Sequence, residues 1–171
     1  MAARLIAERE GWSAVTIRRL ADEIEYSQPV IYSHFENKEA ILEAVAVEGF
    51  REFTSKMEEA AARGSTDRNA LENVATAYLD FAFGQTALYE AMFALPTGLR
   101  FASPAETKPE LRAAFRSLAA VIRPFGAEVE LTTETFWASL HGLVELERSG
   151  RNRPSARAER VALVVRWVLG G

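Results

Sequence analysis

The chain has 171 residues, of which 49% are hydrophobic and 26% charged, a balance typical of soluble globular proteins. Its longest apolar runs are far too short to cross a bilayer, and the absence of cysteine excludes disulfides and thiolate metal sites. No secretory segment is visible at the N-terminus, so we expect a cytoplasmic protein with no membrane partner. The net charge of -4 gives no overall attraction to nucleic acid, so any binding of nucleic acid must come from a local surface.

The first clear helix signal follows Thr16. The Thr16 hydroxyl can cap the backbone N–H groups of a first turn. The apolar residues that follow have helical spacing, which predicts a short helix with one buried side: Ile17, Leu20, Ala21 and Ile24.

A second short helix is predicted for residues 28–35. Ser27 is a suitable cap residue, and Pro29 in the first turn removes a backbone N–H that would lack a partner there. Ile31 and Phe35 lie four residues apart and form a core face. The other side of this helix presents groups that can contact base edges and phosphates, as a helix in a major groove does: Gln28, Val30, Ser33 and His34, with Tyr32 toward one edge.

A third helix is predicted from Lys38, with Asn37 as its cap. Lys38 in the first turn adds a positive charge to exposed backbone N–H groups, a combination that suits a phosphate. The residues expected to bind DNA are therefore Thr16, Ser27, Gln28, Pro29, Val30, Tyr32, Ser33, His34 and Lys38.

The charge balance of residues 1–45 opposes DNA binding. Eight acidic residues against five basic ones leave a net charge of -3, which predicts weak non-specific affinity. The basic residues are Arg4, Arg9, Arg18, Arg19 and Lys38, and the acidic ones are Glu8, Glu10, Asp22, Glu23, Glu25, Glu36, Glu39 and Glu43. Phosphate contacts act locally, so the acidic side chains can lie away from the binding face.

The rest of the chain also predicts helices, separated by segments rich in glycine and proline. No alternating strand pattern is visible, so the expected fold class is all-α. The division expected is an N-terminal helix-turn-helix domain over residues 1–45 and a helical ligand-binding and dimerisation domain over residues 46–171. The helices are predicted at residues 38–62, 69–83, 87–95, 107–122, 133–147 and 155–169.

The middle helices carry bulky apolar or amphipathic side chains of the kind that line small-molecule sites. An ordinary packed core is the commoner role for any one of them, and a histidine beside Gly142 is more often a hydrogen-bonded core residue than a sensor. The set expected to bind a ligand is Tyr78, Phe81, Tyr89, Met92, Phe93, Phe115, Leu118, Trp137 and His141.

The last two predicted helices, residues 133–147 and 155–169, are apolar around more than half of their circumference. A helix that is apolar on several sides needs more than one neighbour, and a second copy of the chain can supply it. We therefore expect a homodimer through these helices. The alternative is that they complete a monomeric core.

Two parts of the chain resemble the TetR (tetracycline-repressor) family. The first runs from Ala3 to about Val45 and includes Thr16-x-x-x-Leu-Ala and Ile31-Tyr-Ser-His-Phe-x-Asn-Lys-Glu, of which Tyr32-Ser-His-Phe-Glu-Asn-Lys38 is the most specific run. The second, from about Tyr78 to Leu169, resembles a subgroup in which a Trp and then His-Gly lie on the penultimate helix: Phe136-Trp-Ala-Ser-Leu-His-Gly-Leu-Val-Glu-Leu146.

This resemblance implies a ligand-responsive transcriptional regulator. The main expectation is a repressor that binds a palindromic operator as a homodimer. The effector would be small and apolar or amphipathic, and no cofactor or metal is implied. Two departures stand out: Glu25 occupies a turn position that is usually glycine in the family, and the chain begins inside the expected first helix, without the usual basic arm.

Two other functions stay open, a helical small-molecule binding protein without DNA binding and an all-helical enzyme. Catalysis has little support, because the chain has two histidines, no cysteine and no recognisable nucleophile, phosphate-loop or metalloprotease motif. We therefore expect a protein that is not an enzyme.

Overall fold

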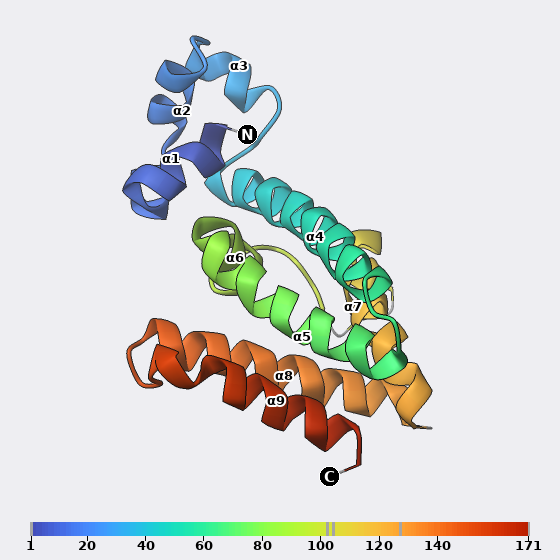
Figure 1. Ribbon diagram of the computed structural model, residues 1–171. Coiled ribbons are helices and arrows are strands. Elements are labelled where there is room, and N and C mark those ends of the chain that lie inside the picture. Colours follow the sequence, from blue (N-terminus) through green and yellow to red (C-terminus); the bar gives the residue numbers. More distant parts are fainter. Residues whose placement is uncertain (1, 102, 104, 127, 171) are drawn as a thin grey trace. The chain divides into compact units, whose positions relative to one another are not determined.

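A computed structural model describes residues 2–101, 103, 105–126 and 128–170. Over these residues the protein consists of helices and loops with no strand, which confirms the all-α prediction (Figure 1). None of the described helices has both the length and the apolar character needed to cross a bilayer. The α-helices are α1 (Ala2–Glu10), α2 (Ile17–Glu23), α3 (Gln28–Tyr32), α4 (Lys38–Ala62), α5 (Asp67–Gly84), α6 (Thr86–Phe93), α7 (Pro109–Ile122), α8 (Val129–Arg148) and α9 (Arg157–Val168).

The helices form two compact units. The first comprises Met1–Arg51 and Gln85–Leu111, and the second comprises Glu52–Gly84 and Arg112–Gly171. Helix α4 therefore supplies residues to both units.

In the first unit, α1 packs against α2 and α6, and α2 packs against α3. The indole N–H of Trp12 donates a hydrogen bond of 2.9 Å to the carbonyl oxygen of Ala87, which ties the segment after α1 to α6. Helix α6 also approaches α4 closely, because a Cβ placed on Gly49 would lie 2.7 Å from Met92 Sδ. The short helices before α4 are thus fixed to a neighbour from later in the chain.

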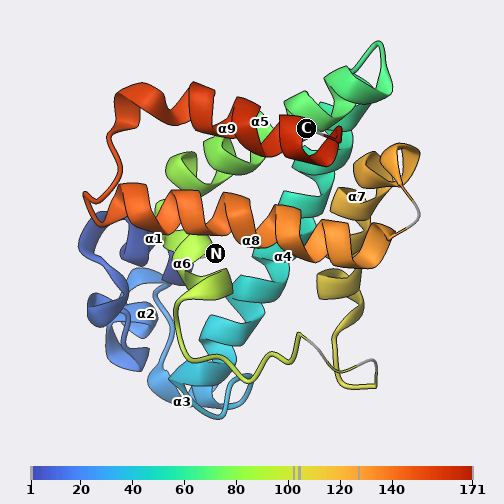
Figure 2. The same ribbon diagram turned by 90° about the horizontal axis from the view of Figure 1, so that it is seen from below.

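In the second unit, α8 and α9 form a hairpin, and α5 packs against both (Figure 2). Phe136, Leu140 and Val144 point from α8 into the core and are fully buried. The Glu147 carboxylate, only 4% exposed, accepts hydrogen bonds from Arg157 and Arg160 of α9. This ion-paired cluster fixes the connected end of the hairpin.

Several local predictions are confirmed. Helix α4 has the predicted bounds, Lys38–Ala62. Thr16 Oγ1 accepts a hydrogen bond of 3.1 Å from the backbone N–H of Arg19, and Asn37 Oδ1 accepts one of 2.8 Å from that of Ala40. Short polar side chains that accept from first-turn N–H groups thus start α2 and α4 as expected.

Three local predictions are wrong in detail. Helix α3 ends at Tyr32 rather than Phe35, because the Ser33 hydroxyl donates to the carbonyl oxygen of Val30 and the chain turns there. Ser27 has the position of a cap residue, but its side chain makes no capping hydrogen bond. Helix α8 begins at Val129, four residues before the predicted start.

Candidate functional site

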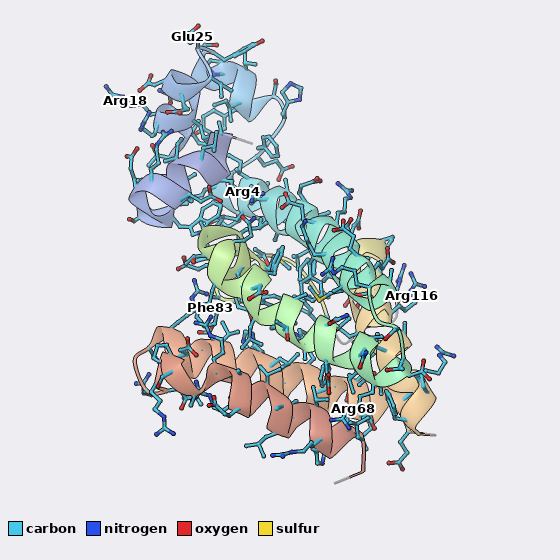
Figure 3. All side chains as sticks on the ribbon, viewed as in Figure 1. Arg4, Arg18, Glu25, Arg68, Phe83 and Arg116 are labelled. Atoms are coloured by element: carbon cyan, nitrogen blue, oxygen red, sulfur yellow. The ribbon has the colours of Figure 1, made fainter. Side chains whose placement is uncertain are left out.

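The turn between α2 and α3 has the geometry of a helix ending in a left-handed residue. The backbone N–H of Tyr26 donates 3.0 Å to the carbonyl oxygen of Ala21, and that of Ile24 donates 3.1 Å to Leu20. Glu25 adopts φ = 57°, in the left-handed region that favours glycine. Glu25 therefore adopts this conformation without being glycine, and its side chain points outward at the end of the unit (Figure 3).

Helix α3 is held to the first unit by a single buried side chain. Ile31 is 6% exposed, whereas Val30 is 39% and Tyr32 53% exposed. Gln28 and Pro29 are exposed as well. A short helix that buries one residue leaves almost its whole surface for contact with a partner, as the recognition helix of a DNA reader requires.

Seven of the nine residues expected to bind DNA are exposed and lie on both sides of the buried Ile31: Ser27, Gln28, Pro29, Val30, Tyr32, Ser33 and His34. Thr16 lies apart in sequence, at the start of α2. Lys38 lies at the start of α4 and is half-buried, and its ammonium group donates 2.8 Å to the carbonyl oxygen of Trp12. Lys38 therefore uses one of its three donors for the fold and has two left for a phosphate.

Two of the arginines in this part of the chain are engaged in a salt-bridge cluster between α1 and α2. Arg9 pairs with Glu23 at 2.9 Å, and Arg19 pairs with Glu10 at 3.0 Å and with Glu23 at 2.9 Å. Hydrogen bonds from Arg9, strengthened by the charges of Arg9 and Arg19, lower the pKa of Glu23. The carboxylates beside both guanidinium groups would repel a phosphate, so these two arginines are poorly placed to bind DNA.

Arg18 is a basic residue that is not among the residues expected to bind DNA from the sequence. It is exposed, and within the described part of the chain its side chain makes no hydrogen bond or ion pair. Figure 3 shows it extending outward from α2, the helix that precedes α3. A signal was present, because Arg18 stands two residues before the buried Leu20 and so lies on the opposite side of the helix.

Three of the nine residues expected to bind a ligand lie on α6, in the first unit. Tyr89 and Met92 are buried, and the ring of Phe93 lies 4.7 Å from that of Tyr89 between centroids. Phe93 also makes an edge contact with Phe50 of α4 at 5.4 Å. In this unit the predicted Tyr89 and Phe93 of α6 form an aromatic cluster with Phe50 of α4, which was not among the predicted residues.

The other six lie in the second unit, on α5, α7 and α8: Tyr78, Phe81, Phe115, Leu118, Trp137 and His141. The Trp137 indole N–H donates 3.1 Å to the hydroxyl of the buried Tyr78. Tyr78 and Phe81 both make edge contacts with Phe53 of α4, at 5.4 and 5.5 Å between centroids. These aromatic rings therefore pack against one another, with the hydrogen-bonded pair of Trp137 and Tyr78 among them.

His141 lies half-buried on α8. Burial lowers the pKa of the imidazole, the Glu145 carboxylate acts in the opposite direction, and the Arg148 charge lowers the pKa further. The balance of these effects lowers the pKa of the His141 imidazole below its usual value, which favours the neutral form.

Helices α8 and α9 expose large apolar side chains. Leu131 and Leu146 on α8 and Leu163 and Trp167 on α9 are all more than 40% exposed. Exposed apolar residues concentrated on two neighbouring helices are typical of an interaction surface.

Comparison with known protein families finds two matches that together cover most of the chain. Residues 1–45 match the family described as bacterial regulatory proteins, tetR family. Residues 71–167 match the tetracyclin repressor-like C-terminal domain.

Individual proteins give the same result. The chain is 29% identical over 150 residues, 84% of its length, to an uncharacterized helix-turn-helix transcriptional regulator of Mycobacterium tuberculosis, Rv0681, and it spans 65% of that protein's length. It shares its fold with a Rhodococcus protein of unknown function, at a TM-score of 0.78 and 21% identity, covering 98% of this chain and 89% of that one. It also resembles FadR of Bacillus subtilis, solved in complex with stearoyl-CoA, at a TM-score of 0.73 and 18% identity, covering 99% and 95% of the two chains.

Proposed function

The chain belongs to the TetR family of bacterial regulatory proteins, and on this basis we propose that it is a ligand-responsive repressor that binds a palindromic operator as a homodimer. Residues 1–45 would be the DNA-binding domain, and residues 46–171 would bind the effector and form the dimer. Because its target is DNA, the proposed location is the cytoplasm.

The observation that carries the DNA-binding role is the exposure of α3. Its one buried residue, Ile31, fixes the helix, while the side chains around it are free to enter a major groove. Arg18 on α2 and the remaining donors of Lys38 are the positive groups proposed to contact phosphates.

A dimer would place two α3 helices in successive major grooves. Half-sites one helical turn apart require recognition helices about 34–36 Å apart. A change in the distance between the two α3 helices therefore prevents them from fitting both half-sites at once. Helix α4 supplies residues to both units and is the proposed route by which a bound effector alters this spacing. An effector that prefers one state by ~100-fold provides about 2.7 kcal/mol of coupling.

The proposed effector is a small apolar or amphipathic molecule that contacts the aromatic cluster around Tyr78 and Trp137. The support is the packing of several rings around one polar pair and the similarity of the fold to a regulator solved with stearoyl-CoA. Stearoyl-CoA is therefore a suitable first probe, with free coenzyme A as the control. The effector is expected to lower duplex affinity, and no effect of either compound would point to a different ligand class.

Fluorescence anisotropy with labelled duplex DNA tests the proposed function. A regulator loses duplex affinity steeply as the salt concentration rises, because bound phosphates release counterions. A small-molecule carrier would bind an apolar probe and show no salt-dependent association with DNA. We further propose that the chain acts by binding rather than by catalysis, so no probe should be turned over.

A further inference from the structure

The loop that joins α8 to α9, at the left of Figure 2, carries two arginines that the fold itself does not use. Arg151 and Arg153 are both exposed, and neither side chain makes a hydrogen bond or ion pair among the described residues. The side-chain amide of Asn152, which stands between them, is half-buried and also has no partner in that part of the chain. Three consecutive residues therefore have side-chain donors available for a ligand.

The backbone of this loop is bonded to the end of α8. The backbone N–H groups of Arg151 and Asn152 donate 2.8 and 3.0 Å to the carbonyl oxygen of Leu146. Gly150 adopts φ = 71°, the left-handed conformation that commonly ends a helix. A turn that is already ordered has little conformational freedom left to lose when a ligand binds. The free side chains are thus presented from a fixed support.

Arg160 of α9 fixes the other side of the loop and still has donors to spare. Its Nη2 group donates 2.9 Å to the carbonyl oxygen of Arg153 and 3.2 Å to Glu147 Oε2. Its Nε and Nη1 groups make no bond within the residues that the structure describes. Arg160 therefore both positions Arg153 and adds N–H groups of its own to the same place.

Residues 151–153 and Arg160 line one depression of about 490 Å³, which we call the arginine site. The rest of its lining is one carboxylate, Glu159, and two apolar side chains, Ala156 and Leu163. Three arginines and one glutamate give this lining a net charge of +2, whereas the whole chain has a net charge of -4. A concave surface with this local excess of positive charge attracts a small anion.

We propose that the arginine site binds a phosphate dianion, either free or as the terminal group of a small phosphomonoester. Such a group carries close to two negative charges at pH 7, which matches the charge of the lining. Its oxygens can accept the paired N–H groups that each guanidinium presents in one plane, and the Asn152 amide can donate to a further oxygen. A carboxylate has one charge and two oxygens, so it would leave part of this lining unmatched.

The arginine site shares no residue with the aromatic cluster around Tyr78 and Trp137 or with the residues expected to bind DNA. The inference therefore goes beyond the proposed function and does not depend on it. A chain that binds phosphate but no duplex, or a duplex but no phosphate, would separate the two.

Isothermal titration calorimetry at constant ionic strength tests the ligand class with inorganic phosphate, phenyl phosphate and benzoate. Both phosphates should bind saturably, and benzoate should bind on the order of tenfold more weakly because it carries a single negative charge. Tighter binding of phenyl phosphate than of inorganic phosphate would identify an organic phosphate as the ligand, since Ala156 and Leu163 can contact its ring. Equal affinities would identify the free ion. No binding of either phosphate, or binding of benzoate as tight as that of phenyl phosphate, would overturn the proposal.

Two variants with opposite expected effects test the location. Arg151→Gln with Arg153→Gln should weaken the binding of phenyl phosphate on the order of tenfold or more, because two charged donors are lost. Glu159→Gln removes the carboxylate that repels the ligand and should tighten binding about two- to fivefold. The matched controls are Arg63→Gln and Glu58→Gln, which remove exposed charges that have no side-chain partner among the described residues and should leave the affinity unchanged.

Phosphate binding that survives the double arginine variant, or that Glu159→Gln leaves unchanged, would overturn the assignment of this site. A double variant that loses duplex affinity but keeps its affinity for phenyl phosphate would also overturn it, because the arginines would then serve nucleic acid. The side chains of Arg151 and Arg153 make no bonds within the described part of the fold, so the variant should keep the circular dichroism spectrum of the wild-type chain.

Discussion

The backbone N–H of Tyr26 donates a hydrogen bond of 3.0 Å to the carbonyl oxygen of Ala21, which closes the turn between α2 and α3. Glu25 lies inside this turn at φ = 57°. A residue with a Cβ adopts this conformation at a cost of roughly 1 kcal/mol relative to glycine. The turn before α3 therefore carries a conformational cost that a single substitution can remove.

Glu25→Gly is expected to raise the free energy of unfolding by about 1 kcal/mol, because glycine adopts the left-handed conformation without a steric penalty. Chemical denaturation followed by circular dichroism measures it. Glu36→Gly is the control, since Glu36 has no positive φ and gains nothing from glycine. A loss of stability in Glu25→Gly equal to that of Glu36→Gly would contradict this description of the turn.

Arg18→Ala is expected to weaken duplex binding and to reduce the slope of log affinity against log salt by about 0.9, the value for one lost phosphate contact. Arg9→Ala removes the same charge from a side chain that is already paired with Glu23, and it should change the slope less. Anisotropy titrations of both variants over a series of salt concentrations provide the comparison. Equal changes in slope would show that pairing with carboxylates does not decide which arginine contacts DNA.

Glu147→Gln should lower the free energy of unfolding at pH 7 by about 1–2 kcal/mol, because a charged hydrogen-bonded cluster is lost while Arg157 is partly screened by solvent. Hydrogen bonds from Arg157 lower the pKa of Glu147, so the unfolded chain takes up a proton more readily than the folded one. The stabilisation is thus complete above the unfolded-state pKa and is lost as the pH falls through the folded-state value.

Denaturation curves from neutral pH to about pH 3 check this sign. The wild-type chain should lose more stability on acidification than Glu147→Gln. Glu145→Gln, two residues away and exposed, is the control and should follow the wild-type curve. A variant that loses as much stability on acidification as the wild type would show that Glu147 is not the titrating group.

Gly49→Ala should destabilise the first unit by about 1–3 kcal/mol, although alanine is the better helix former. The added Cβ would lie 2.7 Å from Met92 Sδ and 2.9 Å from Leu88 Cδ1, so these two buried side chains must move from their packed positions. Gly84→Ala on α5 meets open space and should be neutral or stabilising. Thermal unfolding of the two variants compares them, and a gain of stability at Gly49 would show that α6 does not approach α4 this closely.

The sequence predicts local features of this fold well because they depend on neighbouring residues. The bounds of α4 and the caps at Thr16 and Asn37 follow from side chains within four positions. The end of α3 is different, since the competing bond from Ser33 to the Val30 carbonyl oxygen leaves no mark in the hydrophobic pattern.

Long-range partners could not be predicted from periodicity. Nothing near Lys38 in the sequence indicates that its ammonium group reaches the Trp12 carbonyl oxygen. Likewise, a charge count treats Arg9 and Arg18 alike, whereas the fold places carboxylates beside Arg9 and leaves Arg18 without a partner among the described residues. The residues expected to bind DNA and ligand remain predictions that only binding experiments can test.

Selection of bound sequences from a random pool of duplex DNA tests the central claim most directly, when the wild-type chain is compared with Tyr32→Ala. Tyr32 is 53% exposed at the end of α3, and its loss should weaken binding to the selected sequence about tenfold while the dimer stays intact. Tyr26→Ala, which removes an exposed tyrosine from the turn, should have a smaller effect. The account predicts enrichment of an inverted repeat with half-sites about one helical turn apart. A folded wild-type chain that enriches no sequence would contradict it, and so would a Tyr32→Ala variant that binds the selected sequence as tightly as the wild-type chain does.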